Sequence, residues 1–126
     1  MVEGAQRCAL DFRGGVRGTV AIKVLLADDH RLILEGIRSA LSVAPDIEVV
    51  GEANCGAHVL PLVNKLRPDV VLLDIRMPQM DGLSVLELLH KRHPEIKVVV
   101  LSVFADAEHI QAALKRGASG YIVKSI

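Results

Sequence analysis

Five side chains with useful chemistry stand at the ends of apolar runs in this sequence. They are Asp28, Asp29, Asp74, Ser102 and Lys124. Three carboxylates that crowd together repel one another and require a cation. Mg²⁺ suits them, because this hard ion binds a few carboxylates and keeps several waters. The ammonium and the hydroxyl would complete a clamp for a phosphoryl group. An Asp carboxylate can also be the nucleophile that forms an aspartyl phosphate.

Each of these residues also has a purely structural interpretation. An Asp after a strand is most often the N-cap of the next helix, and Ser102 and Lys124 taken alone would be a loop hydroxyl and a solvated terminus. Asp74 does not fit this interpretation, because the helix after it is expected to start only near position 81. The five residues taken together favour a functional site. If each one only capped a helix or faced solvent, there would be no reason for opposite charges to gather at one edge of the sheet.

The rest of the sequence predicts the elements that would position these residues. Apolar runs predict strands over 21–27, 47–53, 69–73, 96–101 and 120–123, and helical spacing predicts helices over 31–43, 55–67, 82–93 and 107–116. Pro61 indicates either the start of the second helix or a kink in it. Five strands alternating with helices indicate an α/β fold, a doubly wound parallel sheet covered on both faces. Such a sheet places its site at the carboxyl ends of the strands.

Composition limits the other readings. The 126 residues fit one domain, 51% of them are hydrophobic, and 15 basic residues balance 15 acidic ones, so net charge points to neither nucleic acid nor membrane. No apolar run reaches membrane-spanning length, and a cytoplasmic location is expected. Residues 1–20 lack the apolar stretch of a signal peptide. We therefore expect a flexible extension over 1–20 and one domain over 21–126.

Four segments, in this order along the chain, carry a resemblance to a known family. The chain resembles the CheY-like receiver domain of two-component response regulators in LLADDH (25–30), VVLLDIRMPQMDG (70–82), VVVLS (98–102) and GASGYIVK (117–124). ADDHRLILEGIRSAL and GASGYIVK further resemble the NarL/LuxR-type subgroup. The resemblance implies a flavodoxin-like five-stranded parallel sheet with order 2-1-3-4-5. It also implies a full-length transcription regulator with a C-terminal DNA-binding domain.

The resemblance implies a role for the acidic residues. Asp74 would accept the phosphoryl group from a cognate sensor histidine kinase. Asp29 would bind Mg²⁺ directly, Asp28 would help through a water, and the backbone carbonyl of Arg76 would be the third protein ligand. The domain would then be a signalling domain that undergoes phosphorylation and dephosphorylation, rather than an enzyme with a separate substrate.

It also implies how the signal would leave the site. Ser102 and Lys124 would contact the phosphoryl group. Ser102 and Tyr121 would form the switch pair, in which the hydroxyl moves toward the phosphoryl group and the ring turns inward. The signal would pass to the fourth helix and the fifth strand. Without the resemblance, Tyr121 would read as a half-buried aromatic residue of an edge strand.

The sequence departs from the family pattern in four places. Gln79 stands where a small glycine is common, Val103 where a smaller residue is common, and Ser125 where proline is common. In addition, the chain ends before the family's fifth helix. We therefore expect the domain to be truncated, with bare apolar sheet surface or cover from another copy. A well-folded monomer that binds no hydrophobic dye would contradict this expectation.

Other functions remain as alternatives. A Mg²⁺-dependent phosphohydrolase of the haloacid-dehalogenase type also uses a strand-end Asp, but it usually has a second Asp where this chain has Arg76. A pseudo-receiver that is never phosphorylated is a further alternative, and a homodimer is left open. No GxGxxG follows the first strand, and we expect no direct contact with nucleic acid or membrane by this stretch. The five histidines, at 30, 58, 90, 93 and 109, are expected at solvated helix positions.

Overall fold

A computed structural model describes residues 21–77 and 81–124. The five strands are β1 (Ile22–Ala27), β2 (Ile47–Ala53), β3 (Val70–Asp74), β4 (Lys97–Ser102) and β5 (Gly120–Val123). The helices are α1 (Arg31–Leu41), the 3₁₀ turn η4 (Gly56–His58), α2 (Val59–Leu66), α3 (Gly82–Arg92) and α4 (Ala107–Lys115). The expected extension over 1–20, Gln79 and Ser125 lie outside the described residues.

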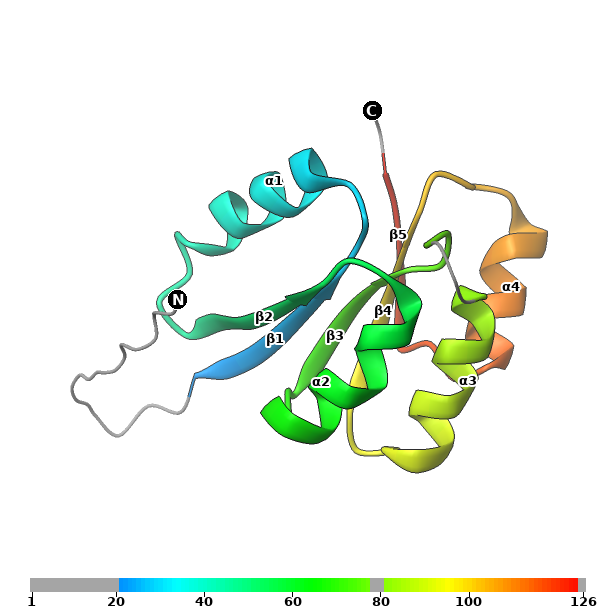
Figure 1. Cartoon of the computed structure of the whole chain (residues 1–126). Coiled ribbons are helices and arrows are strands. Elements are labelled where there is room, and N and C mark those ends of the chain that lie inside the picture. Colours follow the sequence, from blue (N-terminus) through cyan, green and yellow to red (C-terminus); the bar gives the residue numbers. More distant parts are fainter. Residues whose placement is uncertain (1–20, 78–80, 125–126) are drawn as a thin grey trace.

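All five strands are parallel and lie in the order β2-β1-β3-β4-β5, as expected (Figure 1). The alternation of side chains along the strands divides the core into two layers. The larger layer includes Leu25, Val71, Leu73 and Val100 and packs under α2, α3 and α4. The smaller layer, around Val24, Leu26 and Leu34, packs under α1 on the other face.

β3 is the central strand, and its burial explains why its carboxyl end is held rigidly. β1 pairs with one side of it and β4 with the other, so its backbone hydrogen bonds are made on both edges. Val71 and Leu73 are fully buried, which contributes on the order of 1.5–3 kcal/mol for each side chain. Asp74 is the last residue of this strand, and its partner in β4 is Leu101.

The second helix differs from its prediction. The expected helix over 55–67 is a 3₁₀ turn followed by α2, which begins at Val59. Pro61 therefore falls in the first turn of α2, where a missing N–H leaves no bond unmade. Pro61 lies at the start of the helix and does not kink its middle. Arg67 ends α2 in a left-handed conformation, with φ of 51°.

Two helices begin at capping aspartates, and α3 starts at Gly82, beside the expected position 81. Asp81 caps α3 by accepting from the backbone N–H of Leu83, which leaves Asp74 free of a capping role. Asp106 caps α4 by accepting from the backbone N–H of His109. Gly117 follows α4 with φ of 107°, a conformation that strongly favours glycine.

The face of the sheet that α1 covers is only partly covered in the described part of the chain. α1 lies over β1 and β2 (Figure 1), whereas Ile122 on β5 is 50% exposed. The expectation that this surface needs further cover stays a prediction. Among the described residues, no helix is long and apolar enough to span a membrane.

Gly82 makes a close approach that fixes the start of α3 against the end of β3. A Cβ at this position would lie 2.2 Å from Cα of Ile75. Gly82→Ala should therefore lower the free energy of unfolding by roughly 2–4 kcal/mol, measured by urea denaturation. Gly36→Ala is the matched control, because a Cβ there meets nothing within 4 Å. In α1 that change should stabilise the chain by about 0.5–1 kcal/mol. Equal stability of the two variants would contradict the packing.

Candidate functional site

The strand register brings two buried carboxylates side by side. Ala27 at the end of β1 pairs with Leu73 of β3, so Asp28 and Asp74 follow at the same level of the sheet. Asp28 is 0% exposed and Asp74 is 1% exposed. The backbone N–H of Asp28 also donates to Ala53 on β2, which continues the β1–β2 ladder as far as the site.

Lys124 supplies the positive charge between these carboxylates. Its backbone N–H donates to the Ser102 carbonyl at 2.6 Å, which extends the β4–β5 ladder by one residue. From there the ammonium Nζ lies 3.0 Å from Oδ2 of Asp28 and 3.3 Å from Oδ2 of Asp74, and the side chain is only 8% exposed. Buried ions stay charged only when they are paired, so the lysine and the two carboxylates stabilise one another.

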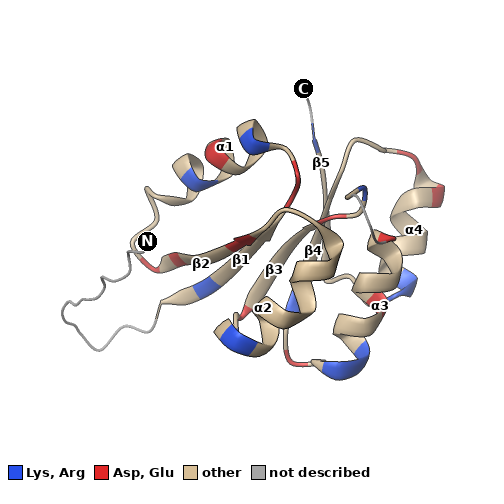
Figure 2. Cartoon of the chain, in the orientation of Figure 1, with Lys and Arg blue, Asp and Glu red and all other residues tan. Residues whose placement is uncertain are grey.

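Asp29 is the outward member of the cluster. Its side chain is 29% exposed, in contrast to the buried Asp28 beside it. The carboxylates of Asp28, Asp29 and Asp74 and the ring of His30 each offer a ligand atom within 4.8 Å of the others. Figure 2 shows the acidic ribbon at the ends of β1 and β3 and the basic position at the end of β5. The predicted acidic cluster is therefore assembled as expected.

The two buried carboxyls are pushed in opposite directions. Burial acts to raise the pKa of Asp28, but hydrogen bonds from the His30 backbone, the His30 ring and Lys124 outweigh it, and the pKa is lowered. Burial also raises the pKa of Asp74, and the negative charge of Asp28 adds to this. The Arg76 N–H, which donates to Oδ1 of Asp74 at 2.9 Å, and Lys124 offset it only in part.

The donor set fits Mg²⁺. Three carboxylates from two strand ends are hard oxygen ligands, and they carry more negative charge than Lys124 alone neutralises. Both oxygens of Asp28 already accept hydrogen bonds, whereas Asp29 is partly open to solvent. The direct role of Asp29 and the water-mediated role of Asp28 stay predictions.

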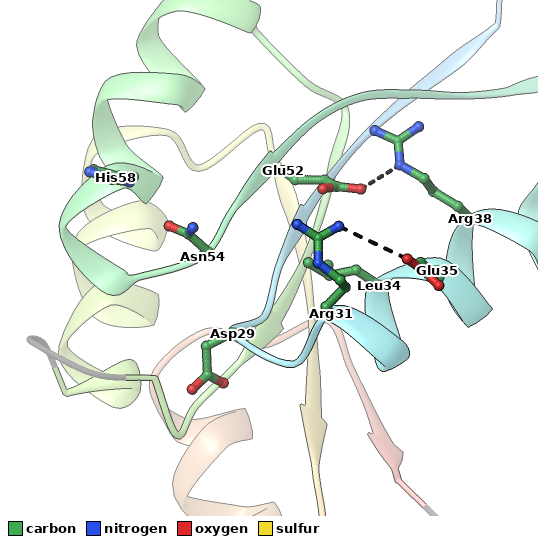
Figure 3. A pocket seen from close by; sticks show the side chains of 8 residues that line it. All are labelled: Asp29, Arg31, Leu34, Glu35, Arg38, Glu52, Asn54 and His58. Carbon is green, nitrogen blue, oxygen red and sulfur yellow. Dashed lines mark hydrogen bonds and ion pairs between the residues drawn. The ribbon is translucent and has the colours of Figure 1, made fainter.

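A pocket of about 590 Å³ opens beside the cluster, and Asp29 belongs to both (Figure 3). It is lined by Asp29, Arg31, Leu34, Glu35, Arg38, Glu52, Asn54 and His58. Arg31 pairs with Glu35 at 3.9 Å, and Arg38 pairs with Glu52. These charges pair with one another within the pocket, which leaves open space next to Asp29.

Ser102 and Tyr121 are joined through a residue that the sequence analysis did not single out. Ser102 is buried, and its Oγ accepts from the backbone N–H of Phe104 at 3.1 Å. The half-buried Tyr121 donates its hydroxyl to the carbonyl of the same Phe104 at 2.7 Å. The backbone of Phe104 thus bridges the two side chains. Backbone groups leave no signal in a sequence, so this bridge could not be found there.

The ring of Phe104 links this bridge to the loop after β3. The guanidinium of Arg76 lies over the ring, 5.2 Å from its centroid. His109 of α4 stacks on the ring at 4.1 Å and pairs with Asp106. Since the Arg76 backbone holds Asp74, a continuous set of contacts runs from the carboxylate to α4 and β5.

His30 is a second residue whose place was missed. Its ring is 54% exposed, as expected of a solvated position, but its contact with the acidic cluster was not expected. It is the N-cap residue of α1, and its Nδ1 lies 2.8 Å from Oδ1 of Asp28 and 3.2 Å from Oδ1 of Asp29. Its position directly after the two aspartates was the available signal.

Comparison with known proteins places this architecture in a family. Residues 24–126 match the model of the response regulator receiver domain. The chain is 44% identical to the nitrate/nitrite response regulator NarL of Escherichia coli over 103 residues, which are 82% of this chain and 48% of that protein. It is 40% identical to the transcriptional regulatory protein DegU of Brevibacillus brevis over 105 residues, 83% of this chain and 44% of that protein. The chain spans about half the length of these relatives.

Solved structures agree. The signal receiver domain of a NarL response regulator from Mycobacterium tuberculosis superposes with a TM-score of 0.79 and 37% identity, and the match covers 85% of this chain and 86% of that one. The isolated receiver domain of RcsB from Salmonella enterica serovar Typhimurium, with the phosphomimetic BeF₃⁻, gives a TM-score of 0.78 at 27% identity, over 82% of this chain and 78% of that one. With its sheet order, its strand-end acidic cluster and these relatives, the chain belongs to the response regulator receiver domain family, among receivers of the NarL/LuxR type.

Proposed function

We propose that this chain accepts a phosphoryl group on Asp74 from a sensor histidine kinase, with Mg²⁺ held at Asp28, Asp29, Asp74 and the carbonyl of Arg76. The observation that carries the proposal is the pairing of the buried Asp74 carboxylate with Lys124 at 3.3 Å, beside two further aspartates. A strand-end carboxylate with a fixed cation and room for a metal is suited to phosphoryl transfer.

In the proposed reaction an oxygen of Asp74 attacks phosphorus. The new bond joins that oxygen to phosphorus, and the bond between phosphorus and the kinase's imidazole nitrogen breaks. Lys124 is placed to stabilise negative charge on the phosphoryl oxygens, while the Arg76 N–H keeps the other carboxylate oxygen oriented at 2.9 Å. Bound Mg²⁺ would neutralise charge on the same oxygens.

The switch follows from the bonds of Ser102. Its Oγ accepts from Phe104 in this conformation. A move of the hydroxyl toward a phosphoryl group on Asp74 breaks that bond and frees the Phe104 backbone, which also holds the Tyr121 hydroxyl. Phosphorylation therefore biases an equilibrium between two loop conformations. α4 and β5 would report the change, because His109 and Tyr121 both contact Phe104.

The role in the whole protein extends this proposal. The relatives are about twice as long as this chain, and one solved neighbour is RcsB bound to the promoter rprA in the presence of BeF₃⁻. We propose that the receiver controls a C-terminal DNA-binding domain in a cytoplasmic transcription regulator. The described residues would make no contact with DNA, and the exposed sheet face at Ile122 would be covered by further chain or by a second copy in a homodimer.

The alternatives are less well supported. A phosphohydrolase of the haloacid-dehalogenase type needs an acid or base two residues after the nucleophile, and Arg76 lies over the Phe104 ring instead. A pseudo-receiver needs none of the buried charges. Lys124 nevertheless pairs with Asp28 and Asp74 in this chain. In a pseudo-receiver, apolar side chains at these positions would stabilise the fold at least as well as this buried ion pair.

Labelling tests the phosphoacceptor. Acetyl phosphate with Mg²⁺ should give an acid-stable, base-labile adduct on the chain, seen by intact-protein mass spectrometry. Asp74→Asn should abolish it completely, because the nucleophilic oxygen is gone. Asp46→Asn, at an exposed turn, should label like the parent. An adduct that persists in Asp74→Asn would refute the assignment.

A pH titration tests the electrostatics of the site. Without Mg²⁺, the raised pKa of Asp74 means that its carboxylate takes up a proton at a higher pH than that of an ordinary Asp. Asp28→Asn removes a like charge and should lower the pKa of Asp74 in the absence of Mg²⁺, as followed by carboxyl ¹³C NMR. Asp106→Asn should leave it unchanged. An unchanged or higher pKa in Asp28→Asn would contradict the proposed charge coupling.

The single tyrosine of the chain gives a direct test of the switch. With 3-fluorotyrosine at position 121, one ¹⁹F signal is expected, and it should move when beryllium trifluoride and Mg²⁺ are added. Ser102→Ala should weaken the shift, because the bond between the Ser102 hydroxyl and Phe104 is already absent. Asp74→Asn should abolish it. A signal that stays in place in the parent chain would rule out the ring movement.

A further inference from the structure

His30 holds its ring in the middle of the acidic cluster. Its backbone N–H donates to Oδ1 of Asp28 at 2.9 Å, which fixes the residue at the start of α1. Its Nδ1 then lies 2.8 Å from Oδ1 of Asp28, 3.2 Å from Oδ1 of Asp29 and 3.8 Å from Oδ2 of Asp74. One nitrogen thus faces all three carboxylates of the site.

These spacings match those between ligands of one small ion. For metal–ligand distances of about 2.1 Å, neighbouring ligands of an octahedral ion lie about 3.0 Å apart and opposite ligands about 4.2 Å apart. The distances from Nδ1 to the oxygens of Asp29 and Asp74, 3.2 and 3.8 Å, fall within this range, and the 2.8 Å contact with Asp28 is a hydrogen bond that holds the ring in place. The whole set of four ligand atoms lies within 4.8 Å, so only a small contraction is needed. An ion that reached the carboxylates would meet Nδ1 or push the ring away.

We propose that Nδ1 of His30 is a metal ligand, which makes this a mixed nitrogen–oxygen site. The inference rests on the proposed function, since it concerns the metal of that same site. Imidazole raises affinity for first-row transition ions such as Mn²⁺ and Co²⁺ far more than for Mg²⁺, which prefers oxygen. His30 therefore sets the ion selectivity of the receiver. The ring is 54% exposed, so the proton on Nδ1 can leave to solvent or move to Nε2 when the ion binds.

Calorimetric titrations of the 126-residue chain with Co²⁺ and with Mg²⁺ test the selectivity. His30→Ala should weaken Co²⁺ binding by roughly tenfold or more and change Mg²⁺ binding by less than about threefold. His30→Asn repeats the test with a residue that remains a good N-cap, so that loss of the α1 start does not produce the effect. His58→Ala is the matched control, because this exposed histidine lines the neighbouring pocket without joining the cluster.

Pulsed electron paramagnetic resonance of bound Mn²⁺ gives an independent readout. Directly bound nitrogen should produce ¹⁴N coupling in the parent chain and in His58→Ala, and this coupling should vanish in His30→Ala. Tighter binding of both ions in His30→Ala would overturn the proposal, because it would show that the ring competes with the ion. An unchanged ratio of Co²⁺ to Mg²⁺ affinity, or ¹⁴N coupling that survives, would overturn it too.

The two proposals fail in different ways. If the parent chain binds Mg²⁺ and labels on Asp74 but shows no nitrogen coupling, the metal-ligand role of His30 is wrong and the phosphoacceptor function stands. If the parent binds neither ion, both are wrong.

Discussion

The structure depends on one electrostatic constraint: two carboxylates that the sheet buries must share a buried cation. Asp28 and Asp74 are placed side by side by the register of β1 and β3, and Lys124 lies within 3.3 Å of both. Neither carboxylate could stay ionised at this depth without a partner. This partner, Lys124, directly follows β5. The end of β5 must therefore be paired with the sheet for the charges of the two carboxylates to be partly neutralised.

The same constraint explains why the site favours binding of a further cation. Lys124 leaves the cluster with an excess of negative charge, because three aspartates surround one ammonium. Burial and the negative charge of Asp28 raise the pKa of Asp74, and the surplus of negative charge favours the entry of further positive charge. A divalent ion would meet that demand. The proposed ion binding and the proposed phosphoryl transfer would therefore both depend on this one charge imbalance.

The architecture and the acidic cluster were predictable because they depend on pattern. Five apolar runs with helical segments between them indicate the parallel sheet, and parallel strands bring Asp28, Asp74 and Lys124 to one edge. The strand order 2-1-3-4-5 came from the family resemblance, and the structure confirms it. The position of Pro61 in the first turn of α2 needed the structure, because a 3₁₀ turn before it leaves no distinct spacing.

What the sequence could not give depends on backbone groups and ring orientation. Phe104 joins Ser102 to Tyr121 through its N–H and carbonyl, which every residue except proline possesses. The position of the His30 ring depends on the extended backbone at the start of α1 and on three acceptors from two strands. Such convergence is a tertiary property, so spacing along the chain did not reveal it.

The position of Lys124 has a consequence for the lifetime of any acyl phosphate. Its backbone is tied to the sheet at the last rung of the outermost strand, by one bond to Ser102. If this end of β5 separated from β4, the ammonium would move away and water would reach the acyl phosphate. A contact that holds the end of β5 in place would keep the acyl phosphate shielded from water. A neighbour docked far from the aspartates could in this way set how long a signal persists, without touching the reacting atoms.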